Sequence, residues 1–136
     1  MPSQGPNNPT TGENDAAYGV VAWELLENIV SSDDLSARGD VDDLGNSPTN
    51  YLKATGFGFT IPSGATIDGI VVEIERLEAR GGIDQIEDDR VRIVKAGVVG
   101  ATEKAIAGAW PTVDTYQTYG TSTDLWGETW TVANIN

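Results

Sequence analysis

Carboxylate side chains are the residues of this sequence whose type and spacing could support chemistry. The chain has 21 Asp and Glu residues but no His and no Cys. Adjacent acids occur at Asp33-Asp34, Asp42-Asp43 and Asp88-Asp89. Sequence neighbours point apart on a strand, whereas glycoside hydrolysis needs two carboxyl groups that face one substrate. A Ser-His-Asp triad also requires His. The sequence therefore predicts a protein that is not an enzyme.

Calcium binding is the chemistry that these acids suit best. A hard cation takes oxygen ligands, often from flexible loops. The candidate ligands lie in two acidic loops and are Asp40, Asp42, Asp43, Asp84, Asp88 and Asp89. Neither loop has the spaced acids and the glycine of an EF-hand. The alternative is that these acids are solvated surface charge, and no other cofactor is predicted.

Four tryptophans in 136 residues are many for a small domain. Trp23, Trp126 and Trp130 are expected to fill the core and corners, where each aromatic ring buries about 150–250 Å². Trp110 precedes Pro111 in an expected loop. It is therefore the candidate for an exposed ring that contacts a glycan.

The net charge of −13 restricts the partners that the chain can bind. Such a chain repels phosphate backbones and anionic membranes, so neither nucleic acid nor membrane is an expected partner. A basic protein surface remains a suitable one. The sequence shows neither a signal peptide nor an apolar run of about 18 residues. We therefore expect a soluble protein made in the cytoplasm.

Short strand patterns between turn residues organise the chain. Residues 1–17 are rich in Pro, Asn, Gly and Thr and are expected to form an extended N-terminal arm. The remainder, 18–136, is expected to be one domain. Residues 24–31 are ambiguous between helix and strand. Strand patterns occupy 18–23, 51–61, 67–79, 90–95, 98–99, 115–119 and 125–132.

Two local features sharpen this prediction. Gly56 and Gly58 interrupt a strand pattern, which indicates a bulge or a close backbone approach. The segments 67–79 and 90–95 alternate in the same way and are expected to pair as antiparallel strands. Arg90 and Arg92 would then lie opposite Glu73 and Glu75, an arrangement that favours one register. The whole pattern predicts an all-β, antiparallel sandwich or barrel.

From residue 46 onward the chain resembles a domain family of bacteriophage virion proteins, which includes decoration and tail-fibre-associated proteins. The N-terminal Pro6-Asn7-Asn8-Pro9 and Val21-Ala22-Trp23 also resemble that family's opening. The other matching segments are 50–59, 61–70, 73–76, 91–95, 109–111 and 124–127. The resemblance implies a jelly-roll-like β-sandwich in a virion.

The resemblance also implies a function. The leading hypothesis is a capsid decoration or cement protein that binds the major capsid protein or other virion proteins, and also itself, as a trimer by analogy. Family members usually continue for two strands past the point that matches Asn136. We therefore expect either fewer strands or an open sheet edge, which the arm of a neighbouring subunit would cover through Pro6, Asn7, Asn8 and Pro9. The alternative function is a carbohydrate-binding module of a tail fibre or spike.

Overall fold

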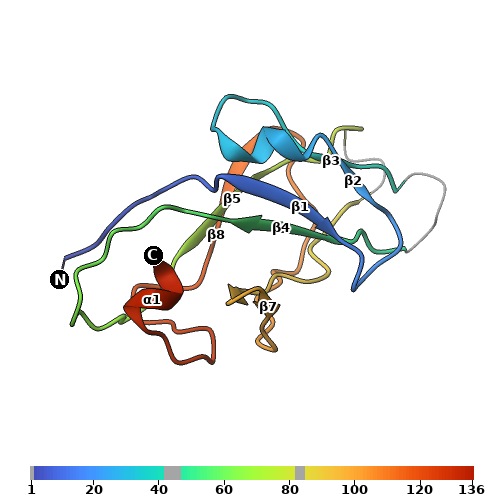
Figure 1. The fold of residues 1–136 in the computed structure, drawn as a ribbon. Helices are drawn as coiled ribbons and strands as arrows, with labels where there is room; N and C mark the ends of the chain where they lie inside the picture. Colours follow the sequence, from blue (N-terminus) through green and yellow to red (C-terminus); the bar gives the residue numbers. More distant parts are fainter. Residues whose placement is uncertain (1, 42–46, 82–84) are drawn as a thin grey trace. The chain divides into compact units, whose positions relative to one another are not determined.

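The computed structural model describes residues 2–41, 47–81 and 85–136, and its regular structure is mostly β-strand (Figure 1). The helical elements are short, namely the 3-10 helix η1 (Leu26–Val30) and helix α1 (Val132–Ile135). No helix in the described ranges is long and apolar enough to cross a membrane. The strands are β1 (Thr11–Asp15), β2 (Trp23–Glu24), β3 (Arg38–Gly39), β4 (Tyr51–Thr55), β5 (Val72–Arg76), β6 (Val94–Lys95), β7 (Val98–Val99) and β8 (Thr115–Tyr119).

The described strands pair two by two. Four antiparallel sheets result, with the orders β1-β4, β2-β3, β5-β8 and β6-β7. The prediction of an all-β, antiparallel protein is confirmed at this level, whereas the sandwich or jelly-roll arrangement stays a prediction. The chain divides into two compact units, 1–60 with Asn136 and 61–135. Each unit is described below by itself.

The longer sheet of the first unit joins β1 to β4. Glu13 lies directly opposite Lys53 in the register, and the Lys53 Nζ is 3.3 Å from a carboxylate oxygen of Glu13 and 3.4 Å from one of Asp15. A cross-strand ion pair of this kind favours one register over its neighbours. On the other face of β1, Gly12 leaves room for η1, because a Cβ there would lie 2.5 Å from the Leu26 carbonyl oxygen.

The N-terminal arm expected over residues 1–17 is not confirmed. Residues 11–15 of that segment are strand β1, which is paired along its whole length with β4 of the same chain. Upstream, the Gln4 side chain accepts a hydrogen bond from the Thr60 N–H at 2.8 Å and donates one to the Thr60 carbonyl at 3.2 Å. The Asn7 side chain donates to the Phe57 carbonyl at 2.8 Å. An amide side chain can thus satisfy the backbone groups that a neighbouring strand would satisfy.

The glycines at 56 and 58 end the strand that the sequence predicts over 51–61. Both have positive φ, and β4 stops at Thr55. The close approach is confirmed at Gly56, where a Cβ would lie 2.1 Å from the Thr10 Oγ1. At Gly58 a Cβ would meet no atom within 4 Å. The first glycine is therefore required by crowding as well as by backbone conformation.

In the second unit, the predicted pairing of 67–79 with 90–95 is wrong. Strand β5 pairs with β8 instead, with Val72 opposite Tyr119 and Arg76 opposite Thr115. Arg92 forms its ion pair with Glu103 at 3.0 Å and not with a residue of β5. Local alternation fixes which face of a strand is apolar, but it does not choose the partner strand.

The remaining predictions for the second unit have mixed outcomes. The strands expected at 98–99 and 115–119 are confirmed. Strand β7 pairs with β6 through a turn in which Ala96 and Gly97 both have positive φ, as a two-residue type I′ hairpin requires. The strand expected over 125–132 is wrong, because this segment has a turn at 126–127 and irregular structure up to the start of α1 at Val132.

Few residues in the described ranges are buried when backbone and side chain are counted together. The apolar ones are Val21, Tyr119 and Trp126, and the polar or charged ones are Asn50, Arg76 and Glu78. A small core contributes little hydrophobic free energy, so satisfied polar groups must carry a large share of the specificity. Ile74, which was expected on an apolar face, is 37% exposed, whereas Arg76 is only 8% exposed.

Gly19 should be among the least replaceable residues of the first unit. Its φ is +75°, and a Cβ there would lie 2.0 Å from the Thr49 carbonyl oxygen, a backbone atom. We expect Gly19→Ala to lower the free energy of unfolding by about 3 kcal/mol or more. The matched control is Gly58→Ala, which has the same backbone strain in open space and should cost about 1–2 kcal/mol. Urea unfolding followed by circular dichroism measures both, and equal losses would contradict the prediction.

Candidate functional site

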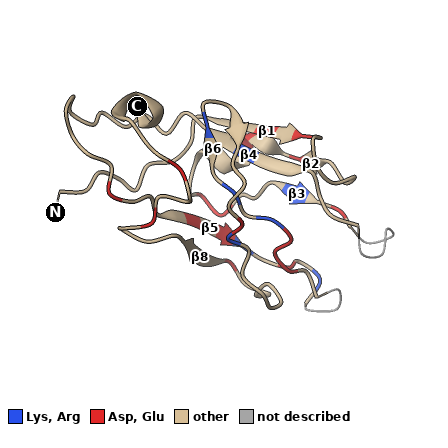
Figure 2. Ribbon diagram, turned by 90° about the horizontal axis from the view of Figure 1, so that it is seen from below, with Lys and Arg blue, Asp and Glu red and all other residues tan. Residues whose placement is uncertain are grey.

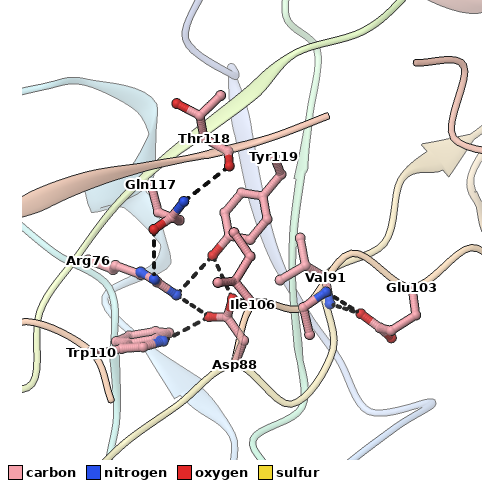
Figure 3. A network of polar contacts seen from close by, with 10 residues as sticks. Arg76, Asp88, Val91, Glu103, Ile106, Trp110, Gln117, Thr118 and Tyr119 are labelled. Atoms are coloured by element: carbon pink, nitrogen blue, oxygen red, sulfur yellow. Dashed lines mark hydrogen bonds and ion pairs between the residues drawn. The ribbon is translucent and has the colours of Figure 1, made fainter. Parts of the chain in front are cut away.

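A network of polar side chains around the most buried ion pair of the described residues lies in the second unit, at Asp88 (Figure 3). Its members are Arg76 on β5, Asp88, Trp110, and Gln117 and Tyr119 on β8. We call these five residues the Asp88 cluster. Arg76, Gln117 and Tyr119 alternate with residues of the opposite face, so the pleat of the β5–β8 sheet directs all three to one side.

Asp88 is the hub of the cluster because both of its carboxylate oxygens accept hydrogen bonds. One oxygen contacts the Arg76 guanidinium and accepts the Trp110 indole N–H at 2.8 Å. The other accepts the Tyr119 O–H at 2.8 Å and the backbone N–H of Ile106 at 3.0 Å. The Asp88 side chain is 2% exposed. A buried carboxylate is stable only when it is paired in this way.

Arg76 supplies the positive charge that balances Asp88. Its guanidinium also donates to the Tyr119 hydroxyl at 2.9 Å and to the Gln117 side-chain oxygen at 3.1 Å. The guanidinium carbon lies 5.4 Å from the centre of the Trp110 ring and 5.9 Å from that of Tyr119. These distances allow cation–π attraction on two sides. The Arg76 Nε is buried and has no hydrogen-bond partner among the described residues.

The cluster shifts the pKa of two of its members. Burial acts to raise the pKa of Asp88, but the hydrogen bonds from Ile106, Tyr119 and Trp110 and the charge of Arg76 outweigh it, so the pKa lies below its ordinary value. Burial, together with the hydrogen bond and negative charge of Asp88, raises the pKa of Tyr119 far above its ordinary value. The cluster thus holds an anionic carboxylate beside a neutral phenol.

Chemically, the Asp88 cluster is a closed network, in which polar groups of this chain bond to one another. It ties β5 and β8 to the segment around Asp88 and to the segment 106–110, where the backbone N–H of Trp110 also donates to the Ile86 carbonyl at 2.6 Å. The oxygens of Asp88 already accept four hydrogen bonds within this chain. The geometry therefore suits the positioning of strands and loops better than the activation of a substrate.

The acids proposed as calcium ligands are placed differently from one another. Asp88 lies in the Asp88 cluster, while Asp40 and Asp89 each interact with other groups of the chain. Asp42, Asp43 and Asp84 lie outside the described residues. Within the described ranges, no three acidic residues come close enough together to hold a metal ion. Calcium binding by the complete loops stays a prediction.

The tryptophans differ in burial and in the group that accepts their indole N–H. Trp126 is 1% exposed and donates to the Ile70 carbonyl at 2.9 Å, as expected for a core residue. Trp23 and Trp130 are half-buried and donate to the backbone carbonyls of Asn50 and Leu125. Trp110, expected to be the exposed one, is also half-buried, with its N–H on Asp88 and the Arg76 guanidinium over its ring.

The sequence contained one signal for this cluster. Arg76 continues the alternation of Ile70, Val72 and Ile74, so an arginine stands at a position of the face expected to be apolar. A buried guanidinium requires a carboxylate partner, but the spacing alone could not identify Asp88 among the 21 acids.

Comparisons with known proteins add no relative to this description. No family model matches the chain, and searches of curated proteins and of solved structures likewise find no match. The resemblance to a phage virion family therefore stays a prediction.

Removal of Asp88 should be far more costly than removal of a partly exposed acid. Asp88→Asn leaves the Arg76 charge buried without a counter-ion, and we expect a loss of about 3–5 kcal/mol in the free energy of unfolding. Glu103→Gln, which removes a pair with the more accessible Arg92, should cost about 1 kcal/mol or less. Arg76→Met and the double variant complete a cycle in urea unfolding. A double variant that loses as much as both single variants together would refute the coupling.

Acid should weaken the fold through the same residue. The folded-state pKa of Asp88 lies below its ordinary value of 3.8. The stability that this carboxylate contributes is thus present above that value, and is lost as the pH falls through the folded-state pKa. Between pH 6 and pH 3, the stability difference between wild type and Asp88→Asn should shrink, as measured by urea unfolding at each pH. A constant difference would contradict this assignment.

Proposed function

We propose that this protein is a non-enzymatic structural component of a bacteriophage particle, a decoration or cement protein that stabilises the capsid through protein–protein contacts. The sequence resemblance supplies the virion context. The observation that carries the assembly role is the pairing of the described strands, each of which belongs to a two-stranded sheet and so has one edge without a strand partner. Proteins cover such edges, and a strand from a neighbouring protein is one way to do so.

The net charge of the chain and the Asp88 cluster are both consistent with this role. A chain of net charge −13 is attracted to a basic protein surface and repelled by nucleic acid. The Asp88 cluster rigidifies the second unit without presenting a reactive group. A rigid module that binds assembled subunits and not free ones stabilises the assembly by mass action.

The jelly-roll-like sandwich and the exchange of N-terminal segments between copies belong to this proposal. Residues 2–8 are exposed. The side chains of Gln4 and Asn7 bond to the backbone groups of Thr60 and Phe57. The same contacts can form with residues 57–60 of a neighbouring copy without any change in local structure. A trimer is the assembly that we propose by analogy.

The carbohydrate-binding alternative has less support. A sugar stacks on a free aromatic face and bonds to nearby polar groups. In Trp110 the indole N–H is donated to Asp88 and the Arg76 guanidinium lies over the ring. The site predicted from the sequence therefore has its polar group and one approach to its ring already occupied.

Binding to capsids tests the proposal. The protein, added to purified capsids of the virus that encodes it and prepared without it, should cosediment to saturation and raise the melting temperature of the capsid. An unrelated acidic protein of similar size and charge serves as the control for non-specific attraction. Absence of saturable binding would overturn the proposed function.

A shortened chain separates the contribution of the N-terminal segment. Deletion of residues 2–8 retains β1 and its pairing with β4, whereas deletion of 1–17 would remove that strand. If the segment is exchanged between copies, the shortened chain should fold but show weaker self-association by sedimentation. Unchanged self-association would dismiss the exchange without affecting capsid binding by other surfaces.

A further inference from the structure

The β5–β8 sheet has an outer face opposite to the Asp88 cluster. Glu73 and Glu75 of β5 lie opposite Thr118 and Tyr116 of β8. These four residues alternate along the strands with the residues of the Asp88 cluster. We call them the acidic face. Glu73, Tyr116 and Thr118 are exposed and Glu75 is partly so, with Tyr116 54% exposed. In Figure 2 the acidic residues of β5 are coloured red on its ribbon.

The acidic face carries two glutamates and no cation. Elsewhere in this unit cations are matched with acids, in the pairs Arg76–Asp88, Arg92–Glu103, Lys95–Glu128 and Lys104–Asp124. Glu73 and Glu75 form no ion pair with the described residues of this unit. Side chains two residues apart on one strand face are about 7 Å apart. Their mutual repulsion is therefore a cost that a partner's cations would relieve.

Apolar surface accompanies these charges. Tyr116 of β8 lies directly opposite Glu75 in the register, and Val71, which directly precedes β5, is 50% exposed. Asp114, directly before β8, is also exposed and adds a further negative charge at the strand end. Exposed aromatic surface beside carboxylates suits an arginine, because its guanidinium can stack on the ring while it pairs with an acid.

We propose that the acidic face docks an extended segment of a partner protein that presents Arg or Lys side chains. Alternating side chains of such a segment have the spacing of Glu73 and Glu75. A second copy of this chain is a poor occupant, because two acidic faces repel each other. This inference rests on the proposed function in one respect, since it names the surface through which a structural module would bind its partner.

A basic peptide tests the inference directly. The probe is a synthetic peptide of alternating arginine and valine, added to the full chain and followed by two-dimensional amide NMR. We expect shifts confined to β5 and β8 and an affinity that falls with added salt. Glu73→Gln/Glu75→Gln should weaken binding about tenfold. The matched control, Glu27→Gln/Asp34→Asn, removes the same charge from exposed positions of the first unit and should bind as wild type does.

The outcomes separate this inference from the proposed function. Shifts outside β5 and β8, or equal losses in both double variants, would overturn the docking face. Self-association of the free chain that maps to the same strands would also overturn it, in favour of a second copy. If the protein binds capsids and Glu73→Gln/Glu75→Gln binds them equally well, the proposed function stands and the docking face fails.

Discussion

The second unit depends on one buried ion pair. Asp88 and Arg76 have side chains that are 2% and 7% exposed, and each would carry an unbalanced charge in a poorly solvated environment without the other. Because the partners of Asp88 come from β5, β8 and the 106–110 segment, the pair can form only when all of these segments are in place. Hydrophobic burial brings such segments together without much geometric preference. The ion pair instead accepts one arrangement, which is how a chain with few fully buried apolar residues can specify its fold.

The two faces of the β5–β8 sheet use charge in opposite ways. On the inner face, a carboxylate and a guanidinium neutralise each other away from solvent, so that face is satisfied within the chain. On the outer face, Glu73 is exposed and Glu75 is partly exposed. One sheet thus combines an inner face whose charges are satisfied within the chain with an outer face that carries carboxylates unpaired among the described residues.

Sequence reasoning predicted what depends on local residues. The strand Thr115–Tyr119, the high strand content and the close approach at Gly56 all follow from alternation or from the special role of glycine. It failed where partners are chosen over long distances. The pairing of β5 with β8 joins residues that the local pattern gave no reason to pair, and the intervening 90–95 segment had an equally suitable alternation. The Asp88 cluster was missed for the same reason. Asp88 stands between two other acids, and nothing in that local sequence indicates which of them is buried. The segment 125–132 was mistaken for a strand because Trp126 and Trp130 have strand-like side chains, although Trp126 has a φ of +57°, which no strand contains.

The positions of Trp23 and Trp126 make the molecule suitable for fluorescence measurements on its separate units. Trp23 bonds to a carbonyl of the first unit and Trp126 to one of the second. The other two tryptophans also belong to the second unit, so a chain in which Trp23 is replaced by phenylalanine emits from that unit alone. The difference in emission between the natural chain and this variant is the signal of Trp23, and therefore of the first unit. The order in which the two units melt can then be read from fluorescence, without isotopes, labels or dissection of the chain.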